Sequence, residues 1–326
     1  MSKLNNKKYE ICIVSAPSST ANLGPGYDVF GLGLNALEDI VTLKVVKKEN
    51  DSNNIIIKIN GEGSKNIPTD PELNSSGKVA KKIISDYDLF DYDCIIDIKK
   101  NVPAGYGMGS SAASAVATAI AFNKIFELNI KEIPLLNYAA EGELASAGVK
   151  HYDNIGGSYF GDFIIVRNEP ELEFIRIKPP KDLTMVVCVP LIEVPRKKTE
   201  VARKVLPEEV PLKKIVQNTS NACTIVAGFF KNDIQMICKG IDDCIIEPAR
   251  QNLIPGYKQV KEESIMAGAL AFTISGAGPS TIAFLDSKIK ANQVSHAMIE
   301  AYKKLDIKCK TFICNSSEGA KVISLK

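Results

Sequence analysis

A glycine-rich loop between residues 103 and 113 has the residue types and spacing to bind an anion. It reads Pro103-Ala104-Gly105-Tyr106-Gly107-Met108-Gly109-Ser110-Ser111-Ala112-Ala113. Glycine at every second position lets the backbone approach a ligand without obstruction by a Cβ atom. The alanines that follow predict a helix, whose free amides and dipole would favour a phosphate near Ser110 and Ser111. The loop is neither a Walker A motif nor a dinucleotide fingerprint, and a helix cap without a ligand is the alternative.

Polar residues also flank a Gly-Pro-Gly turn close to the N-terminus. Asn22 and Asp28 lie on either side of Gly24-Pro25-Gly26, after a predicted strand. A carboxylate at this position could bind the ammonium or hydroxyl group of a ligand. Turn chemistry explains the same residues, so an ordinary turn with Asp28 exposed is the alternative.

A third group of polar residues surrounds one of the two histidines. Gly142-Glu143 is followed by His151-Tyr152-Asp153-Asn154-Ile155-Gly156-Gly157, ahead of a predicted strand. A carboxylate, an amide and an imidazole so close together indicate a site, although a single histidine is often structural.

The fourth segment lies between two predicted strands and reads Ile274-Ser275-Gly276-Ala277-Gly278-Pro279-Ser280. Its glycines permit positive φ angles or a close approach to a ligand. A turn that binds nothing is the equally open alternative.

The composition disfavours several other classes of function. A net charge of +2, from 40 Lys and Arg against 38 Asp and Glu, predicts no large basic field for nucleic acid or a membrane surface. The eight cysteines include no Cys-x-x-Cys pair, so zinc-ligand spacing is absent. With neither an apolar run long enough for a membrane span nor a secretory signal, we expect reduced thiols in a cytoplasmic protein. The basic run Arg196-Lys197-Lys198 is typical of a solvated loop.

Helical and strand patterns interleave along the whole chain. We predict strands over 9–16, 39–48, 54–60, 94–99, 158–166, 183–189, 270–275, 281–285 and 308–314. We predict helices over 74–86, 111–126, 133–147, 213–230, 232–242, 257–267 and 290–305. The order lacks a regular β-α-β alternation, which favours the α+β class with two lobes. Charge and proline concentrate over 167–181, so the two domains are expected at 1–170 and 171–326.

Taken in this order, the four segments resemble the GHMP family of small-molecule kinases. The loop from Pro103 is similar to the family's Pro-x-Gly-x-Gly-Leu-Gly-Ser-Ser-Ala, with a shifted first glycine and with Met108 in place of leucine. Within that family the likeness is greatest to the homoserine kinases. It rests on residues 16–28, 151–154, Glu247-Pro248-x-Arg250 and 274–279. The resemblance implies an N-terminal lobe like domain 2 of ribosomal protein S5 and a ferredoxin-like C-terminal lobe.

The resemblance also implies an activity, the ATP-dependent phosphorylation of L-homoserine to O-phospho-L-homoserine in threonine biosynthesis. The loop would wrap the triphosphate, Asn74 would contact the adenine, and Ser110 with Glu143 would hold Mg²⁺ and, together with Asn154, serve catalysis. The implied homoserine contacts are Asn22, Asp28, His151, Asp153, Arg203 and Arg250. A homodimer is implied as well.

The physical logic of these roles is consistent. An amino acid needs a carboxylate for its ammonium group and a guanidinium fork for its carboxylate, which Asp28 and the arginines supply. Many GHMP kinases have an aspartate where this chain has Asn154. An amide cannot accept a proton, so catalysis here would rest on positioning and charge neutralisation.

One departure keeps other acceptors open. Homoserine kinases usually continue with Val-Ala-Pro where this chain has Ile155-Gly156-Gly157. Another hydroxy metabolite such as mevalonate, a sensor that has lost catalysis, and an ATP-dependent decarboxylase are the alternatives. A hydroxy acid without an amine would not need both Asp28 and Asp153, and an intact Glu143 counts against the sensor.

Overall fold

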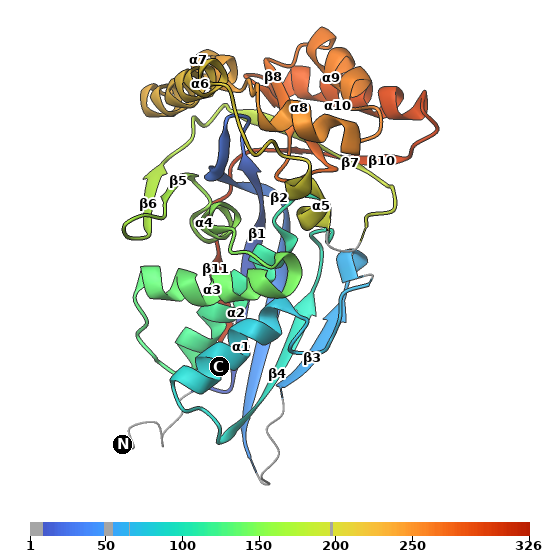
Figure 1. Ribbon diagram of the computed structural model, residues 1–326. Helices are drawn as coiled ribbons and strands as arrows, with labels where there is room; N and C mark the ends of the chain where they lie inside the picture. Colours follow the sequence, from blue (N-terminus) through green and yellow to red (C-terminus); the bar gives the residue numbers. More distant parts are fainter. Residues whose placement is uncertain (1–8, 49–54, 65, 196–197) are drawn as a thin grey trace.

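The protein consists of two β-sheets with helices packed against them (Figure 1). The computed structural model describes residues 9–48, 55–64, 66–195 and 198–326. The strands are β1 (Ile11–Asn22), β2 (Gly26–Lys47), β3 (Ile55–Asn60), β4 (Tyr92–Lys99), β5 (Phe163–Arg167), β6 (Glu173–Ile177), β7 (Thr184–Pro190), β8 (Ala271–Ile274), β9 (Thr281–Leu285), β10 (Cys309–Cys314) and β11 (Lys321–Leu325). The helices are α1 (Ser75–Asp86), α2 (Ser110–Ile125), α3 (Glu132–Ala147), α4 (Tyr152–Phe160), α5 (Lys198–Lys204), α6 (Leu212–Lys231), α7 (Ile234–Gly240), α8 (Ile246–Arg250), α9 (Tyr257–Met266) and α10 (Lys288–Lys303).

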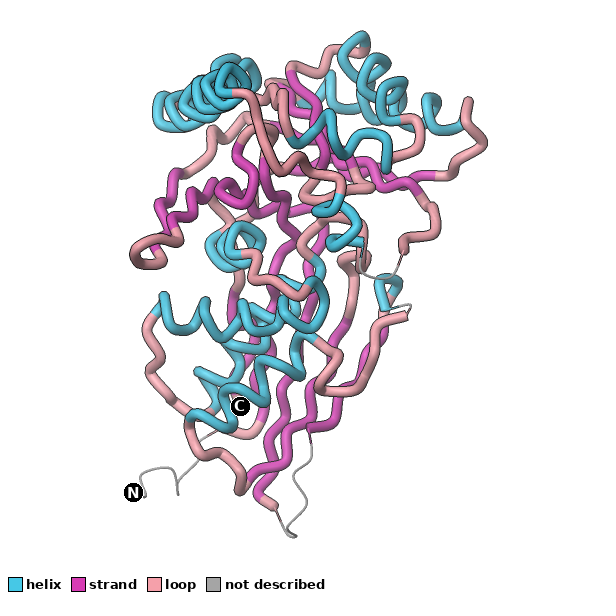
Figure 2. The backbone as a smooth tube through the Cα atoms, in the orientation of Figure 1, coloured by secondary structure: helices cyan, strands magenta, loops and turns pink. Residues whose placement is uncertain are grey.

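The first lobe is a seven-stranded sheet packed against α1 to α4 (Figure 2). Its order is β11-β1-β2-β4-β3, and β5 pairs with both β2 and β6. Only β3 and β4 run parallel among these pairs. Helix α2 crosses the core with nearly every residue buried, because its many alanines let the sheet and the other helices approach closely. Its N-terminus is thereby fixed at the end of the glycine loop.

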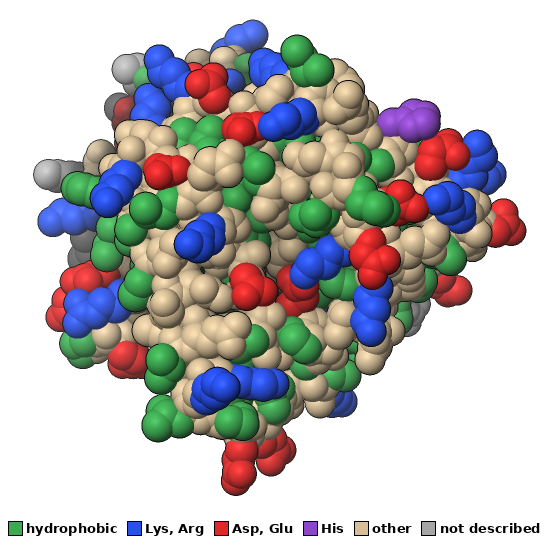
Figure 3. All heavy atoms as spheres, turned by 90° about the horizontal axis from the view of Figure 1, so that it is seen from above, with side chains coloured by type: hydrophobic (Ala, Val, Ile, Leu, Met, Phe, Trp, Pro, Cys, Tyr) green, Lys and Arg blue, Asp and Glu red, His purple; other side chains and the backbone are tan. Residues whose placement is uncertain are grey.

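The second lobe is an antiparallel sheet in the order β10-β7-β9-β8. Val186 and Cys188 of β7 face α9 and α10, whereas Met185 and Val187 face α6 and α7. Helices α5 to α8 are inserted between β7 and α9; without them, the order β7-α9-β8-β9-α10-β10 is the ferredoxin-like arrangement that the resemblance implied. Seen from above, basic and acidic side chains are interspersed over this end of the molecule (Figure 3).

The structure confirms the turn between Asn22 and Asp28 and corrects two other parts of the predicted secondary structure. The turn spans residues 23–25, between the end of β1 at Asn22 and the start of β2 at Gly26. The predicted strand 158–166 begins instead as helix α4 and becomes β5 only at Phe163. Helix α5, which was not predicted, begins at Lys198.

The division at residue 170 remains a prediction, to which the structure adds a detail. Strands β6 and β11, both beyond that residue, join the first sheet, and β11 pairs with β1. The chain therefore returns to its first lobe at its end. Within the described residues, no helix is both long and apolar enough to cross a membrane. The cysteines are free thiols, most of them buried.

Candidate active site

The glycine loop ends in a helix N-terminus that presents unoccupied amides. Gly105, Gly107 and Gly109 have φ angles of +86°, +78° and +65°, a region that favours glycine. Gly109 is the N-cap of α2, and no side chain caps this end of the helix. Because the first amides of a helix have no partner within it, those of α2 are available to an anion.

A second glycine loop packs backbone to backbone against the first. A Cβ atom on Gly107 would lie 2.2 Å from the carbonyl oxygen of Ser275 and 2.8 Å from that of Gly278. The Ser275 hydroxyl donates to the Gly107 carbonyl at 2.8 Å, and Asn22 Nδ2 donates to the Gly276 carbonyl at 2.8 Å. Asn22, predicted as a substrate contact, therefore ties the turn before β2 to this second loop.

A buried ion pair holds the start of the glycine loop. Lys100 and Asp39 contact each other with side-chain exposures of only 4% and 0%. The Asp39 carboxylate also accepts the amides of Asn101 and Val102, each at 3.0 Å. The Lys100 ammonium group reaches the carbonyl oxygen of Ser110, in the first turn of α2. These contacts fix the loop to the helix that follows it.

Asn154 lies directly against the glycine loop. A Cβ atom on Gly109 would be 3.1 Å from the Asn154 amide oxygen and 2.0 Å from the Ser19 hydroxyl. Ser19 donates its hydroxyl to that amide oxygen at 3.1 Å, and its own amide donates to the Met108 carbonyl at 3.0 Å. A fully buried serine therefore orients Asn154 and holds the loop at the same time.

Charged side chains from four parts of the chain contact one another in sequence, from Glu143 through His151 and Arg203 to Asp28. His151 Nδ1 lies 3.1 Å from the Glu143 carboxylate, and its Nε2 lies 3.4 Å from the Arg203 guanidinium. Arg203 in turn donates to both oxygens of Asp28, at 2.9 and 3.1 Å. Helix α3, the residue before α4, helix α5 and strand β2 each supply one member. Residues 175 positions apart in the sequence thus form one ion pair.

Arg250 approaches the same charged side chains from the second lobe. Its Nε donates to the Ala202 carbonyl at 3.0 Å, and it is only 3% exposed. The guanidinium carbons of Arg250 and Arg203 lie 5.0 and 5.5 Å from the centre of the Tyr27 ring. The ring attracts both cations, and burial lowers the pKa of Arg250.

Burial sets the proton affinity of the carboxyl group next to Asn154. Desolvation raises the pKa of Asp153 to about 6, although the neighbouring His151 opposes the change. For His151, burial alone would lower the pKa, but the hydrogen bond and charge of Glu143 outweigh it, and the pKa is raised. A cluster of acids and bases so close together is typical of a functional site.

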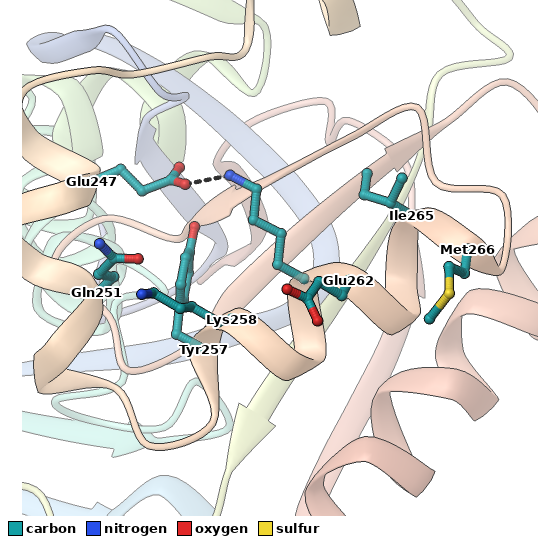
Figure 4. Close-up of a pocket in the computed structure, with 8 residues that line it drawn as sticks. Glu247, Gln251, Tyr257, Lys258, Glu262, Ile265 and Met266 are labelled. Atoms are coloured by element: carbon teal, nitrogen blue, oxygen red, sulfur yellow. Dashed lines mark hydrogen bonds and ion pairs between the residues drawn. The ribbon is translucent and has the colours of Figure 1, made fainter.

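A cavity of about 560 Å³ is lined by Glu247 of α8, by Gln251 just after that helix, and by side chains of α9 (Figure 4). Its wall includes Glu247, whose carboxylate pairs with Lys261 and accepts the Thr273 hydroxyl at 2.9 Å. None of the predicted site residues lines it. Glu247, part of the motif that suggested a family, therefore anchors α8 and so positions Arg250.

Comparisons with known proteins decide the family. The model of the GHMP kinases N-terminal domain matches residues 74–162, and that of the GHMP kinases C-terminal domain matches residues 225–304. The chain is 39% identical to a homoserine kinase of Methanococcus maripaludis over 85% of this chain and 87% of that protein. It is also 39% identical to a homoserine kinase of Methanopyrus kandleri, over 95% of this chain and 98% of that one. This chain belongs to the GHMP kinase family.

Structural similarity supports the same membership. The crystal structure of homoserine kinase from Cytophaga hutchinsonii superposes on this GHMP kinase with a TM-score of 0.87 at 30% identity, covering 98% of this chain and 99% of that one. The resemblance stated from the sequence is confirmed, and so is the two-lobed α+β fold.

The structure brings most of the implied acceptor residues together, but it gives Asn74 other contacts. Asn74 is the N-cap of α1, where its amide oxygen accepts the Ser76 and Gly77 amides at 2.9 and 3.3 Å and its Nδ2 donates to the Pro68 carbonyl at 2.8 Å. It is 3% exposed. Its implied adenine contact stays a prediction, and the contacts described here are those of a helix cap.

Sequence reasoning missed several residues that build the site of this GHMP kinase. They are Ser19, Tyr27, Asp39, Lys100 and Ser275. Ser19, Tyr27 and Ser275 lie inside quoted segments, but nothing marked their individual roles. An aspartate at 39 beside the apolar run that follows, and a lysine at 100 just before the glycine loop, were signals of a buried pair.

Proposed function

We propose that this GHMP kinase transfers the γ-phosphoryl group of ATP to the side-chain hydroxyl of L-homoserine, forming O-phospho-L-homoserine and ADP. The observation that carries the proposal is the ion pair between Asp28 and Arg203, beside His151. The Asp28 side chain is 39% exposed and the Arg203 side chain 32%. Relatives named homoserine kinase, at 39% identity over most of the chain, support the same acceptor.

An amino acid can replace each partner of this pair at once. Its ammonium group would take the place of Arg203 beside Asp28, and its carboxylate would take the place of Asp28 beside Arg203. The pair is only half-buried, so both side chains keep part of their contact with water, and opening it costs less than opening a buried pair. A hydroxy acid without an amine would leave the Asp28 carboxylate without a counter-charge, which disfavours an acceptor such as mevalonate.

The acceptor hydroxyl would lie between Asn154 and the glycine loop. Its oxygen forms a bond to the γ-phosphorus, the bond from that phosphorus to the bridging oxygen of ADP breaks, and the hydroxyl proton leaves to the transferred phosphate. Asn154 takes no proton in this scheme; its amide, oriented by Ser19, positions the hydroxyl. Phosphoryl transfer depends mainly on positioning and on neutralisation of charge.

Mg²⁺ is part of the same proposal, and the residues present suit it. The carboxylate of Glu143 and the hydroxyl of Ser110 are oxygen donors, which a hard cation prefers, and both residues are largely buried. In the described chain no group of three or more His, Cys, Asp or Glu side chains could hold a metal by itself. Phosphate oxygens would therefore complete the coordination, and the bound ion would neutralise phosphate charge.

Release of ADP tests the proposal directly. Purified protein with Mg-ATP would be supplied in turn with L-homoserine, L-serine, L-threonine and mevalonate, and ³¹P NMR would identify the phosphorylated product. We expect ADP release to depend on L-homoserine, and Glu143→Ala to lower turnover by about 10²-fold or more. Turnover with mevalonate alone would overturn the acceptor assignment, and binding of acceptors without ADP release would indicate a sensor. A cytoplasmic location and a homodimer belong to the proposal, and sedimentation measures the second.

A further inference from the structure

Helix α5 reaches three parts of the site within its seven residues. Arg203 pairs with Asp28, and the Ala202 carbonyl accepts the Arg250 guanidinium. At the start of the helix, the partly buried ammonium group of Lys198 donates to the carbonyl of Gly278. The expectation that Lys198 lies in a solvated loop is therefore wrong, while Arg196 and Lys197 lie outside the described residues.

The partner of Lys198 lies where the two glycine loops meet. The Gly278 carbonyl oxygen is 2.8 Å from the position that a Cβ atom on Gly107 would occupy. Two residues further on, Gly109 begins α2 and its uncapped first turn. The ammonium group of Lys198 therefore stands beside the loop that is proposed to wrap the triphosphate.

The charges around Lys198 are not balanced. Among the residues that the structure describes, no carboxylate forms an ion pair with its ammonium group. Burial, followed by the positive charge of Arg250, lowers the pKa of Lys198 to about 7. A lysine held against a second cation, with a carbonyl as its contact, would gain strongly from a nearby anion.

We propose that Lys198 is a catalytic residue that binds a terminal phosphate oxygen of the nucleoside triphosphate at the junction of the two glycine loops. The inference rests on the proposed function, because it needs ATP in that loop, but it does not depend on which acceptor is used. Lys198 exchanges the Gly278 carbonyl for the γ-phosphate, which its flexible stem allows. It then neutralises the charge of the phosphoryl group during transfer.

Lys204 provides a matched control at the other end of the same helix. Its side chain is 72% exposed and pairs with Glu200, so Lys204→Met removes one positive charge from α5 at a solvent-exposed position. The test variants are Lys198→Met, which has a similar length without charge, and Lys198→Arg, which keeps the charge. Thermal melting of each variant would verify that it folds.

Calorimetry with Mg-ATP and Mg-ADP separates the γ-phosphate from the rest of the nucleotide. We expect Lys198→Met to weaken ATP binding by about 10- to 100-fold, as for loss of a charge-assisted hydrogen bond, with ADP binding nearly unchanged. Its kcat should fall by about 10²-fold. Lys198→Arg should recover part of the preference for ATP over ADP, and Lys204→Met should behave like the wild type.

An equal loss of ATP and ADP affinity in Lys198→Met would overturn the inference and show that the lysine only supports the loop. Unchanged affinity for both nucleotides would also overturn it. The acceptor assignment fails separately. If the wild type releases no ADP with L-homoserine while Lys198→Met still loses its preference for ATP over ADP, the inference stands and the proposed acceptor is wrong.

Discussion

Two ion pairs, one at each end of the site, differ sharply in burial. Lys100 and Asp39, beneath the glycine loop, have side-chain exposures of 4% and 0%, whereas those of Arg203 and Asp28 are 32% and 39%. A buried pair is costly to break because it leaves an uncompensated charge, and an exposed pair contributes little. The first pair is therefore part of the architecture, and the second can open for a ligand.

The two ends of the site also differ in whether backbone or side chains form them. The end proposed to bind phosphate, here called the phosphate end, consists of backbone: glycines with positive φ angles, free amides and a neighbouring loop packed against Gly107. The end proposed to bind the acceptor, here called the acceptor end, consists of charged side chains such as Asp28, Arg203 and Arg250. A triphosphate is common to the substrates of many kinases, whereas the acceptor differs among them. A rigid backbone suits the constant part, and side chains that can be exchanged suit the variable one.

The largest effect on stability should come from the buried pair. Lys100→Met leaves the Asp39 carboxylate buried without its counter-charge, so we expect a loss of about 3–5 kcal/mol in the free energy of unfolding. Arg203→Gln should lose less than about 1 kcal/mol. Urea denaturation of both variants measures the difference.

A double variant tests whether the charge of Asp39 is the cause. Asn at position 39 can still accept the amides of Asn101 and Val102, so Asp39→Asn combined with Lys100→Met should recover part of the lost stability. Equal losses in Lys100→Met and Arg203→Gln would remove the distinction between the two pairs.

Adding one methyl group should break the phosphate end. Gly107→Ala combines a φ angle of +78° with a Cβ position 2.2 Å from the Ser275 carbonyl. Because the loop must shift, we expect ATP affinity to fall on the order of 10²-fold. Gly148→Ala is the control, since its φ angle is +72° but nothing lies within 4 Å of its Cβ position. An ATP affinity in Gly107→Ala as high as that in Gly148→Ala would show that the contact with Ser275 does not constrain the loop.

Removing a charge should weaken the acceptor end selectively. Arg203→Gln should raise the KM for L-homoserine by about 10- to 100-fold, as expected for loss of a charge-assisted hydrogen bond, and leave ATP affinity unchanged. Arg167→Gln removes an arginine that is 54% exposed, against 32% for Arg203, from its pair with Glu173 on β6, and should leave both unchanged. A parallel loss of ATP affinity in Arg203→Gln would mean that the two ends are not independent.

The sequence predicted the phosphate end better than the acceptor end for a physical reason. Glycine spacing and an alanine-rich helix are local patterns, and they predicted the loop and α2 directly. The acceptor end depends on pairs such as Asp28 with Arg203, which lie 175 residues apart and meet only when both lobes are folded. The strand predicted over 158–166 was wrong at its start, because residues 158–160 belong to α4, which also contains Gly156 and Gly157. In the structure they are small residues that let α4 pack closely, with the Gly157 Cβ position 3.1 Å from the side chain of Ser19.

The smallest expected effect concerns the protonation of Asp153, and it separates the two ends by pH. Its pKa is raised by burial from an ordinary 3.8 to about 6, so the carboxyl group is neutral in the free enzyme below that pH. A neutral carboxyl group attracts the ammonium group of an amino acid less. At saturating ATP, kcat/KM for L-homoserine should therefore fall by up to about tenfold per pH unit below pH 6, while ATP affinity measured over the same range should not follow this group.

A pKa raised in the folded state also means that ionisation destabilises the fold, with no cost below about pH 3.8 and the full cost above about pH 6. Asp153→Asn, which can still accept the Asn154 amide, should lose the inflection near pH 6 and be more stable than the wild type above it. An inflection that persists in Asp153→Asn would assign it to another group and leave Asp153 outside acceptor recognition.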